Sequence, residues 1–209
     1  MAAETRQRIV EATEKCFGLY GYDKTTIKDI ADEAGLTTGA LYHYFDSKQD
    51  LFAAVFAGCR DQLVGSFIKA AETADTAVGK LCAILDRAVQ MNIEDEHIAR
   101  FISAADIEIG RHPELAELLR DLPKEPDVLS FYKGIVRQGI KRGELSPDTD
   151  VQGLVDMINA VTLGFSQFAA YHSNVRAHKR AIETFKLLLQ GQLFQPAAGR
   201  STARRRRTG

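Results

Sequence analysis

The chain has 209 residues, 45% of them apolar, and its 27 basic and 28 acidic side chains give a formal net charge of −1. This length and composition are sufficient to bury a core without disulfides or metal ions. The near-zero total includes a basic C-terminus, because Arg200 and Arg204–Arg207 supply five positive charges within the last ten residues. The net charge of the chain therefore does not indicate a polyanionic partner. Evidence for such a partner has to come from the local arrangement of particular residues.

Nothing in the sequence indicates a membrane or secreted protein. Apolar stretches such as Ala53–Ala57 and Leu187–Leu189 are far shorter than the roughly 20 residues that a membrane span needs. The N-terminus carries Glu4 and Arg6 and has no apolar secretory segment. We therefore expect a cytoplasmic protein with no membrane partner.

The sequence also lacks patterns typical of metal sites and enzymes. The histidines form no H-x-x-x-H or H-E-x-x-H pair, and neither a nucleophile elbow nor a phosphate-binding glycine loop occurs. The cysteines have no C-x-x-C spacing, so we expect buried, reduced thiols at Cys16, Cys59 and Cys82. We expect no metal, no cofactor and no enzymatic activity.

Apolar residues recur at helical spacing almost throughout, which predicts an all-α chain. The first helix is predicted over Thr5–Tyr20, and Gly21 ends it. A second begins at a cap on Thr25 or Thr26 and runs to Ala34, where Gly35 supplies a tight turn. A third is predicted from a Thr37 cap to about Phe45. A fourth runs to about Glu72 from a capping box formed by Ser47 and Asp50.

The C-terminal two thirds of the chain are predicted to contain further helices. Pro123 and Pro126 mark a loop, and Gly143 marks a helix end. The predicted helices are Thr76–Asp95, His97–Ile109, Pro113–Leu122, Val128–Arg142, Thr149–His172 and Val175–Phe194. Residues 196–209 are rich in Ala, Gly, Ser, Thr and Arg, so they are predicted to form a disordered basic tail.

Two short helices joined by a tight glycine turn form a helix-turn-helix, here over about residues 26–45. The residues expected to pack against the first helix are Ile27, Ile30, Ala31, Leu36, Leu41 and Phe45. The residues left facing outward are Thr37, Thr38, Gly39, Tyr42 and His43. Short hydroxyls, a glycine that admits close approach and a phenol suit contacts with phosphates or base edges.

The segment Thr25–Leu51 (TTIKDIADEAGLTTGALYHYFDSKQDL) resembles the signature of the TetR family of ligand-responsive transcriptional repressors. The resemblance covers about residues 5–55, and the rest of the chain matches only in length and helical character. It implies a helix-turn-helix DNA-binding domain over 3–63, followed by a helical ligand-binding and dimerisation domain over 64–195. The implied function is repression from a palindromic operator that a small, mostly apolar ligand releases.

The resemblance implies phosphate contacts by Tyr42 and Lys48, with further backbone contacts by Thr26 and Thr38. Our candidates for base edges are Thr37, Gly39, Ala40 and His43, and Lys28 is a candidate for phosphate attraction. Four of these positions have a simpler explanation. Helix capping alone would account for Thr37, exposed surface for Tyr42 and His43, and pairing with Asp29 or Asp32 for Lys28.

A helix-turn-helix that reads a palindrome is expected to be a homodimer. The last two long helices are the best dimer elements, since their apolar residues are too many for one buried stripe. These residues are Leu154, Ile158, Val161, Leu163, Phe165, Phe168, Phe185, Leu188, Leu189 and Leu193. An ordinary monomer core is the alternative.

The middle helices are the predicted place for a ligand pocket. Its candidate apolar lining is Met91, Phe101, Ile102, Phe131, Ile135, Met157, Phe165 and Phe168. Its candidate polar contacts are Asp106, His112, Asn159 and Gln167. Each of these residues could instead be plain core. A competing hypothesis keeps the DNA-binding fold but places it under the control of a protein partner rather than a small ligand.

Overall fold

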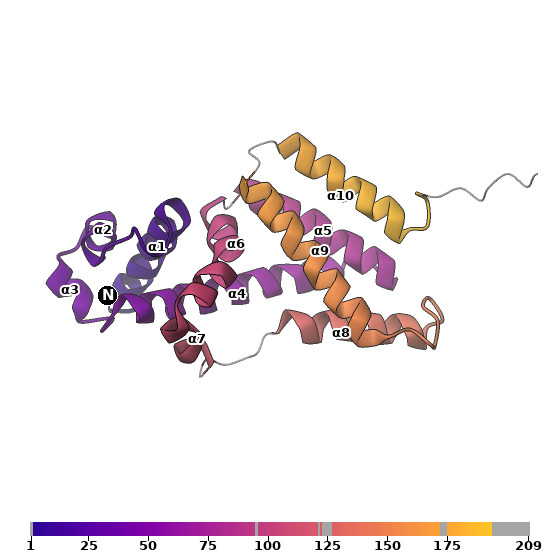
Figure 1. The fold of residues 1–209 in the computed structure, drawn as a ribbon, viewed down its shortest axis with the longest axis horizontal. Helices are drawn as coiled ribbons and strands as arrows, with labels where there is room; N and C mark the ends of the chain where they lie inside the picture. Colours follow the sequence, from indigo (N-terminus) through magenta and orange to yellow (C-terminus); the bar gives the residue numbers. More distant parts are fainter. Residues whose placement is uncertain (1, 95, 121, 123–126, 172–174, 194–209) are drawn as a thin grey trace, which may run out of the picture.

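The computed structural model describes residues 2–94, 96–120, 122, 127–171 and 175–193. Within these ranges the chain forms ten helices and no strand, which confirms the all-α prediction (Figure 1). The helices are α1 (Ala2–Tyr20), α2 (Ile27–Glu33), α3 (Thr38–Tyr42), α4 (Lys48–Ala71), α5 (Ala77–Glu94), α6 (Glu96–Arg111), α7 (Pro113–Arg120), α8 (Val128–Lys141), α9 (Val151–Tyr171) and α10 (Val175–Leu189).

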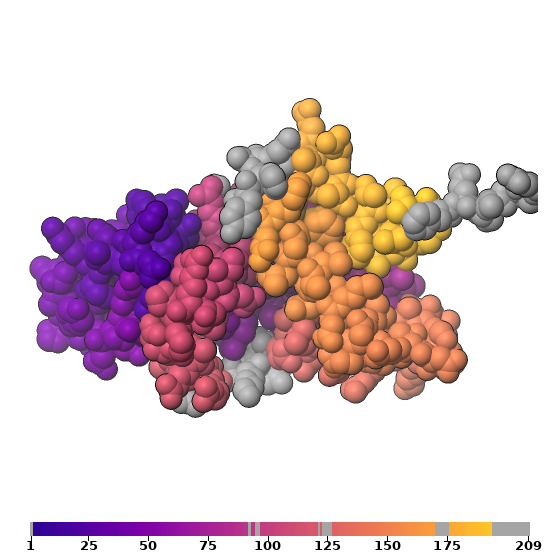
Figure 2. Space-filling view, viewed as in Figure 1, coloured from indigo at the N-terminus to yellow at the C-terminus, as the bar shows by residue number. Residues whose placement is uncertain are grey.

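The molecule is elongated, and its two ends differ in content. Helices α1, α2 and α3, which we call the head, occupy one end, while α8, α9 and α10 lie toward the other (Figure 1). Helix α4 runs from the head along the length of the molecule. In the space-filling view, α6 and α7 lie between the head and α9 (Figure 2).

The predicted helix starts are confirmed where a side chain caps the first turn. Thr26 caps α2 in a capping box with Asp29, and Thr37 caps α3 by accepting a hydrogen bond from the amide of Ala40. Ser47 caps α4 by accepting from the amide of Asp50. Each cap satisfies amides that the first helical turn leaves without partners.

Two predicted helix ends are wrong in detail. Helix α3 ends at Tyr42 rather than near Phe45. Helix α10 ends at Leu189 rather than near Phe194, because Gly191 takes a φ of +69° and the amide of Gln192 donates to the carbonyl of Leu187 over 2.8 Å. A glycine in this conformation closes a helix C-terminus. The prediction of a disordered tail over 196–209 lies outside the described residues.

The head shares its hydrophobic core with the middle of the chain. Side chains from the head pack with Leu51, Phe52 and Val55 of α4, and Ile98 and Phe101 of α6 belong to the same cluster. The ring of Phe101 lies 5.3 Å from that of Phe52 and stacks on Phe17 at 6.2 Å. Helix α6 is therefore part of the interior of the head as well as part of the central region.

A second core joins α5, α8 and α9, and α4 contributes to both cores. Phe67 and Ala71 of α4 pack there with residues of α5, α8 and α9, including Ile84, Tyr132 and Val155. By length and composition alone, α4 is apolar enough to cross a membrane, which the count of uninterrupted apolar runs did not anticipate. In this fold it is a core helix, since it packs against α1, α5, α6 and α7. The three cysteines are buried free thiols, as predicted.

Candidate nucleic-acid interface and ligand cavity

The turn between α2 and α3 sets the position of α3. Gly35 adopts a φ of +64°, a backbone conformation that residues with a side chain rarely adopt. The amide of Leu36 then donates a hydrogen bond to the carbonyl of Ala31 over 2.9 Å. Ile30 and Leu41 are buried beneath the two helices. Helix α3 is thus held rigidly with one face in the core and the other in solvent.

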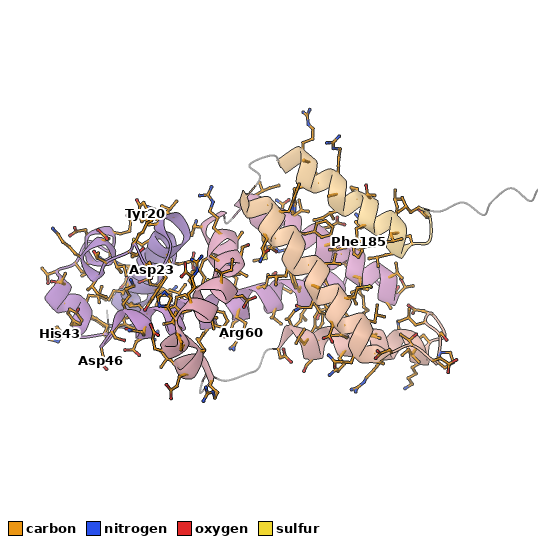
Figure 3. All side chains as sticks on the ribbon, in the orientation of Figure 1. Tyr20, Asp23, His43, Asp46, Arg60 and Phe185 are labelled. Carbon is orange, nitrogen blue, oxygen red and sulfur yellow. The ribbon has the colours of Figure 1, made fainter. Side chains whose placement is uncertain are left out.

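The predicted DNA-contacting residues of α3 and its caps lie on that outer face. Thr37, Thr38 and Gly39 are exposed, Tyr42 is 51% exposed, and His43 is exposed at the C-terminal cap. Figure 3 shows His43 at the outer end of the molecule, far from Phe185 of α10. A Cβ atom built on Gly39 would meet only the Thr37 hydroxyl, at 4.0 Å. Nothing in the described chain covers this face, so a groove of a duplex could receive it.

The remaining candidates differ in how freely they reach solvent. Thr26 and Lys28 are exposed and Ala40 is half-buried. Lys48 is half-buried at the start of α4, with its ammonium nitrogen 4.2 Å from the centre of the Tyr22 ring. Burial lowers the pKa of Lys48, and the carboxylates of Asp23 and Glu108 offset part of that change. Lys48 therefore packs on the head as well as carrying a charge toward its surface.

A cavity of about 80 Å³ lies among α4, α5, α6, α8 and α9. Its lining residues are Leu63, Phe67, Ala88, Met91, Ala99, Ile102, Val128, Tyr132, Asn159, Thr162, Leu163 and Ser166. All of these side chains are uncharged, and most are apolar. The lining suits a small apolar ligand that carries few polar groups.

The structure brings only part of the predicted pocket together. Met91, Ile102 and Asn159 line the cavity. Five predicted residues pack elsewhere: Phe101 lies in the core of the head, Phe131 and Ile135 in the second core, and Phe165 and Phe168 beside the His178 ring. Asp106 and Met157 are exposed, Gln167 is half-buried away from the cavity lining, and His112 lies beside Tyr22.

Nine lining residues carried no sequence signal of their own. Leu63, Phe67, Ala88, Ala99, Val128, Leu163, Thr162, Ser166 and Tyr132 all fit ordinary helix faces. They differ from ordinary core residues only because they lie where five helices meet around the cavity. Tyr132 is an exception in one respect, since a buried phenol in an apolar stripe needs a hydrogen-bond partner and marks a position to examine.

Helix α6 is fastened to the head at both of its ends. Near its start, the His97 imidazole lies 3.0 Å from the Glu14 carboxylate of α1. Just beyond its end, the His112 ring lies 2.9 Å from the Asp23 carboxylate and 3.8 Å from that of Glu108. One possible metal-ligating atom from each of Asp23, Glu108 and His112 lies within 4.8 Å of the other two. Asp23 is far from Glu108 and His112 in the sequence, so their spacing could not reveal the grouping.

Between those ends, the two sides of α6 serve different regions. Ala99 and Ile102 line the cavity, whereas Ile98, Phe101 and Ala105 are buried in the core of the head. An exposed helix α3, a glycine turn that fixes its position, and a cavity joined to the head by α4 and α6 define the class of helix-turn-helix regulators that respond to a ligand.

Comparison with known proteins gives the family. Residues 9–55 match the bacterial regulatory proteins of the tetR family, and residues 77–185 match the tetracyclin repressor-like C-terminal domain. The chain belongs to the TetR family. It is a ligand-responsive, DNA-binding transcriptional repressor.

Individual relatives agree with this family. The HTH-type transcriptional repressor KstR2 of Mycolicibacterium smegmatis is 28% identical over 167 residues, which cover 77% of each chain. The structure of Salmonella enterica GusR is 25% identical, with a TM-score of 0.72, and the match covers 91% of this chain and 95% of that one. Bacillus subtilis FadR in complex with stearoyl-CoA shares the fold, with a TM-score of 0.71 at 22% identity over 88% of this chain and 98% of that one.

Proposed function

We propose that the chain binds a palindromic DNA operator as a homodimer and that a small, mostly apolar ligand in the cavity releases it. The observation that carries this proposal is the division of α6, with Ala99 and Ile102 on the cavity and Ile98 and Phe101 in the core of the head. A change in the cavity therefore acts on the helix that positions the reading surface. In this proposal the protein works by binding alone, without catalysis.

The reading surface divides into two groups of contacts. Thr37, Gly39, Ala40 and His43 lie along α3 and its caps, where a helix inserted in the major groove meets base edges. Phosphate contacts come from residues at the rim of this face: Thr26, Lys28, Thr38, Tyr42 and Lys48. Since residues 1–50 carry six basic and nine acidic side chains, the head is net negative, and hydrogen bonds and backbone approach supply much of the specificity.

The proposed dimer forms through α9 and α10, and α9 offers a surface suited to close helix packing. Gly153, Met157, Ala160 and Gly164 are exposed and follow one another at intervals of four, three and four residues, so they share one face. Small residues in such a stripe let a second helix approach closely. On α10, Leu187 and Leu188 are each 42% exposed, which supplies apolar area beside the stripe.

The size of the cavity indicates how a ligand could release DNA. About 80 Å³ is roughly half of the ~150 Å³ apolar cavity that holds one benzene molecule. A ligand larger than this space has to push a wall outward. Movement of Ala99 and Ile102 displaces α6 and the head with it, which changes the separation of the two heads in a dimer. Release then requires tighter ligand binding to the displaced state than to the DNA-competent state.

DNA binding is tested by fluorescence anisotropy with the DNA upstream of the chain's own gene and with a scrambled duplex. We expect binding to the upstream palindrome only, with a steep loss of affinity as salt rises. Tyr42→Ala should weaken binding at least tenfold. Tyr20→Ala is the matched control, because Tyr20 is a comparably exposed tyrosine on α1. Equal binding to both duplexes would contradict the proposal and favour control by a protein partner.

The dimer is tested by substituting Gly164, where an added Cβ would meet no atom of the same chain within 4 Å. Gly164→Arg should leave the helical content intact and shift the sedimentation coefficient to that of a monomer. Gly134→Arg on α8 is the control, since Gly134 is exposed with the same open surroundings. Dimers that persist in the Gly164 variant would place the interface on other helices.

A further inference from the structure

The wall of the cavity contains a buried phenol whose hydroxyl makes no hydrogen bond within the described part of the chain. Tyr132 of α8 is 1% exposed, and its hydroxyl oxygen makes no hydrogen bond with the residues that the structure describes. The Thr162 hydroxyl lies beside it but donates to the carbonyl of Ile158 over 2.8 Å. Burial raises the pKa of Tyr132, so the phenol remains protonated and keeps its hydrogen to donate.

Tyr132 stands between two spaces. Together with Thr162 it lines the cavity of about 80 Å³ and also a smaller one of about 10 Å³, which Ile84, Leu85 and Phe185 complete. The smaller space has about the volume that one water molecule needs, but its other lining residues are apolar. A polar group from a ligand in the larger cavity is therefore the natural partner for the phenol.

The other polar side chains of the cavity narrow what that group can be. Ser166 donates its hydroxyl hydrogen to the carbonyl of Thr162 over 3.2 Å, so it and Thr162 have already used their donors. Asn159 lines the cavity as well, and its amide makes no hydrogen bond within the described chain. The unused donors are thus the Tyr132 hydroxyl and the NH2 group of the Asn159 amide, and both can donate to an acceptor on a ligand.

We propose that the effector is an uncharged molecule with an apolar body and one hydrogen-bond-accepting oxygen, of the ketone type, which Tyr132 and Asn159 bind. The inference rests on the proposed ligand-release function and adds the chemical class of the ligand. A carboxylate or an ammonium group would lose its hydration in a cavity whose lining has no opposite charge. A pure hydrocarbon would leave the buried phenol without a partner.

The test uses three probes of similar size: acetophenone, α-methylstyrene, which replaces the carbonyl oxygen with a methylene group, and benzoate. Dissociation constants are measured by saturation-transfer NMR on the full-length protein. One hydrogen bond predicts that acetophenone binds about 2- to 12-fold more tightly than α-methylstyrene. Benzoate should bind more weakly than either neutral probe.

Tyr132→Phe removes the hydroxyl and retains the ring. It should reduce the preference for the ketone, leaving the part that Asn159 supplies, without loss of folding, because it deletes a hydroxyl that makes no hydrogen bond with the described residues. Tyr20→Phe is the matched control and should keep the preference, since Tyr20 is exposed on α1 outside the cavity. Circular dichroism checks that both variants fold.

Three results would overturn the inference: tighter binding of benzoate than of acetophenone, an unchanged ketone preference in Tyr132→Phe, or no binding of either neutral probe at millimolar concentration. Anisotropy with operator DNA on the same samples separates the two proposals. Operator binding without a ketone preference refutes the ligand class alone. A Tyr132-dependent ketone preference without operator binding supports the ligand class and refutes the proposed function.

Discussion

Substitution of Gly18 by alanine probes the contact that ties α6 to the head. Gly18 lies in α1 against the first turn of α6, and a Cβ atom there would be 2.6 Å from the carbonyl oxygen of His97. The same Cβ would be 3.1 Å from the carbonyl carbon and from the Cα of His97. Since all three are backbone atoms, no side-chain rotation relieves the overlap. Helices α1 and α6 have to move apart.

Two opposing effects decide the size of the change. Alanine in place of glycine within a helix stabilises by about 1 kcal/mol. Overpacking of a tight contact costs about 1–3 kcal/mol, and here it also strains the stacked rings of Phe17 and Phe101. We expect a net destabilisation of up to about 2 kcal/mol. At roughly 2–4 °C per kcal/mol for a chain of this size, the melting temperature should fall by up to about 8 °C.

Thermal unfolding followed by circular dichroism at fixed protein concentration measures this change. Gly58→Ala is the matched control, because Gly58 lies exposed in α4 with no atom within 4 Å of an added Cβ. The control should keep or raise the melting temperature through helix propensity alone. If Gly18→Ala were as stable as Gly58→Ala, the close approach of α1 and α6 would have no energetic role, and the reasoning would fail.

Three further substitutions test other contacts. Phe101→Ala should lower the free energy of unfolding in urea by about 3–5 kcal/mol, because it empties the ring site between Phe17 and Phe52; a loss below 1 kcal/mol would contradict this packing. Thr26→Ala removes the α2 cap and should cost about 1 kcal/mol, with weaker operator binding. Asp127 caps α8, and although burial raises the pKa of its carboxyl, hydrogen bonds from the first turn lower it more. Its contribution is therefore complete above the unfolded pKa of about 3.9 and is lost as the pH falls through the lower folded pKa. The urea midpoints of wild type and Asp127→Ala should therefore differ at pH 7 and converge as the pH falls below the folded pKa. If the difference between the two urea midpoints stayed constant with pH, the charge of Asp127 would have no part in capping α8.

Local hydrogen bonds explain which parts of the fold could be predicted. The starts of α2, α3 and α4 followed from Thr26, Thr37 and Ser47, because a cap and its amide partner lie within three residues of each other. The end of α10 did not follow, since apolar residues continue past Gly191 and only the backbone shows where the helix closes. The outward face of α3 was predictable from the helical period, because the buried residues Leu41 and Phe45 lie four positions apart and leave Tyr42 and His43 on the other face.

The cavity was predictable only in part, because its walls depend on which helix faces meet. Phe101 and Ile102 are neighbours in sequence, yet their side chains diverge by about 100° around a helix. Phe101 therefore packs in the head and Ile102 faces the cavity. No helical period distinguishes these two destinations, since both are apolar. Tyr132 was missed for the same reason, as its stripe on α8 reads as core.

The energetics of release set a lower bound on the proposed effector. To move the protein from 99% DNA-competent to 99% released, a ligand has to favour the released state by about 5.5 kcal/mol. At about 0.8 kcal/mol for each buried methylene, apolar contact alone would need about seven such groups that are buried only in the released state. The cavity of about 80 Å³ is smaller than one that holds the six carbons of benzene. Most of that burial must therefore occur in space that opens as the wall formed by Ala99 and Ile102 moves. In this proposal, hydrogen bonds to Tyr132 and Asn159 set which ligand is accepted, and apolar burial in the space that opens with α6 supplies the free energy that releases DNA.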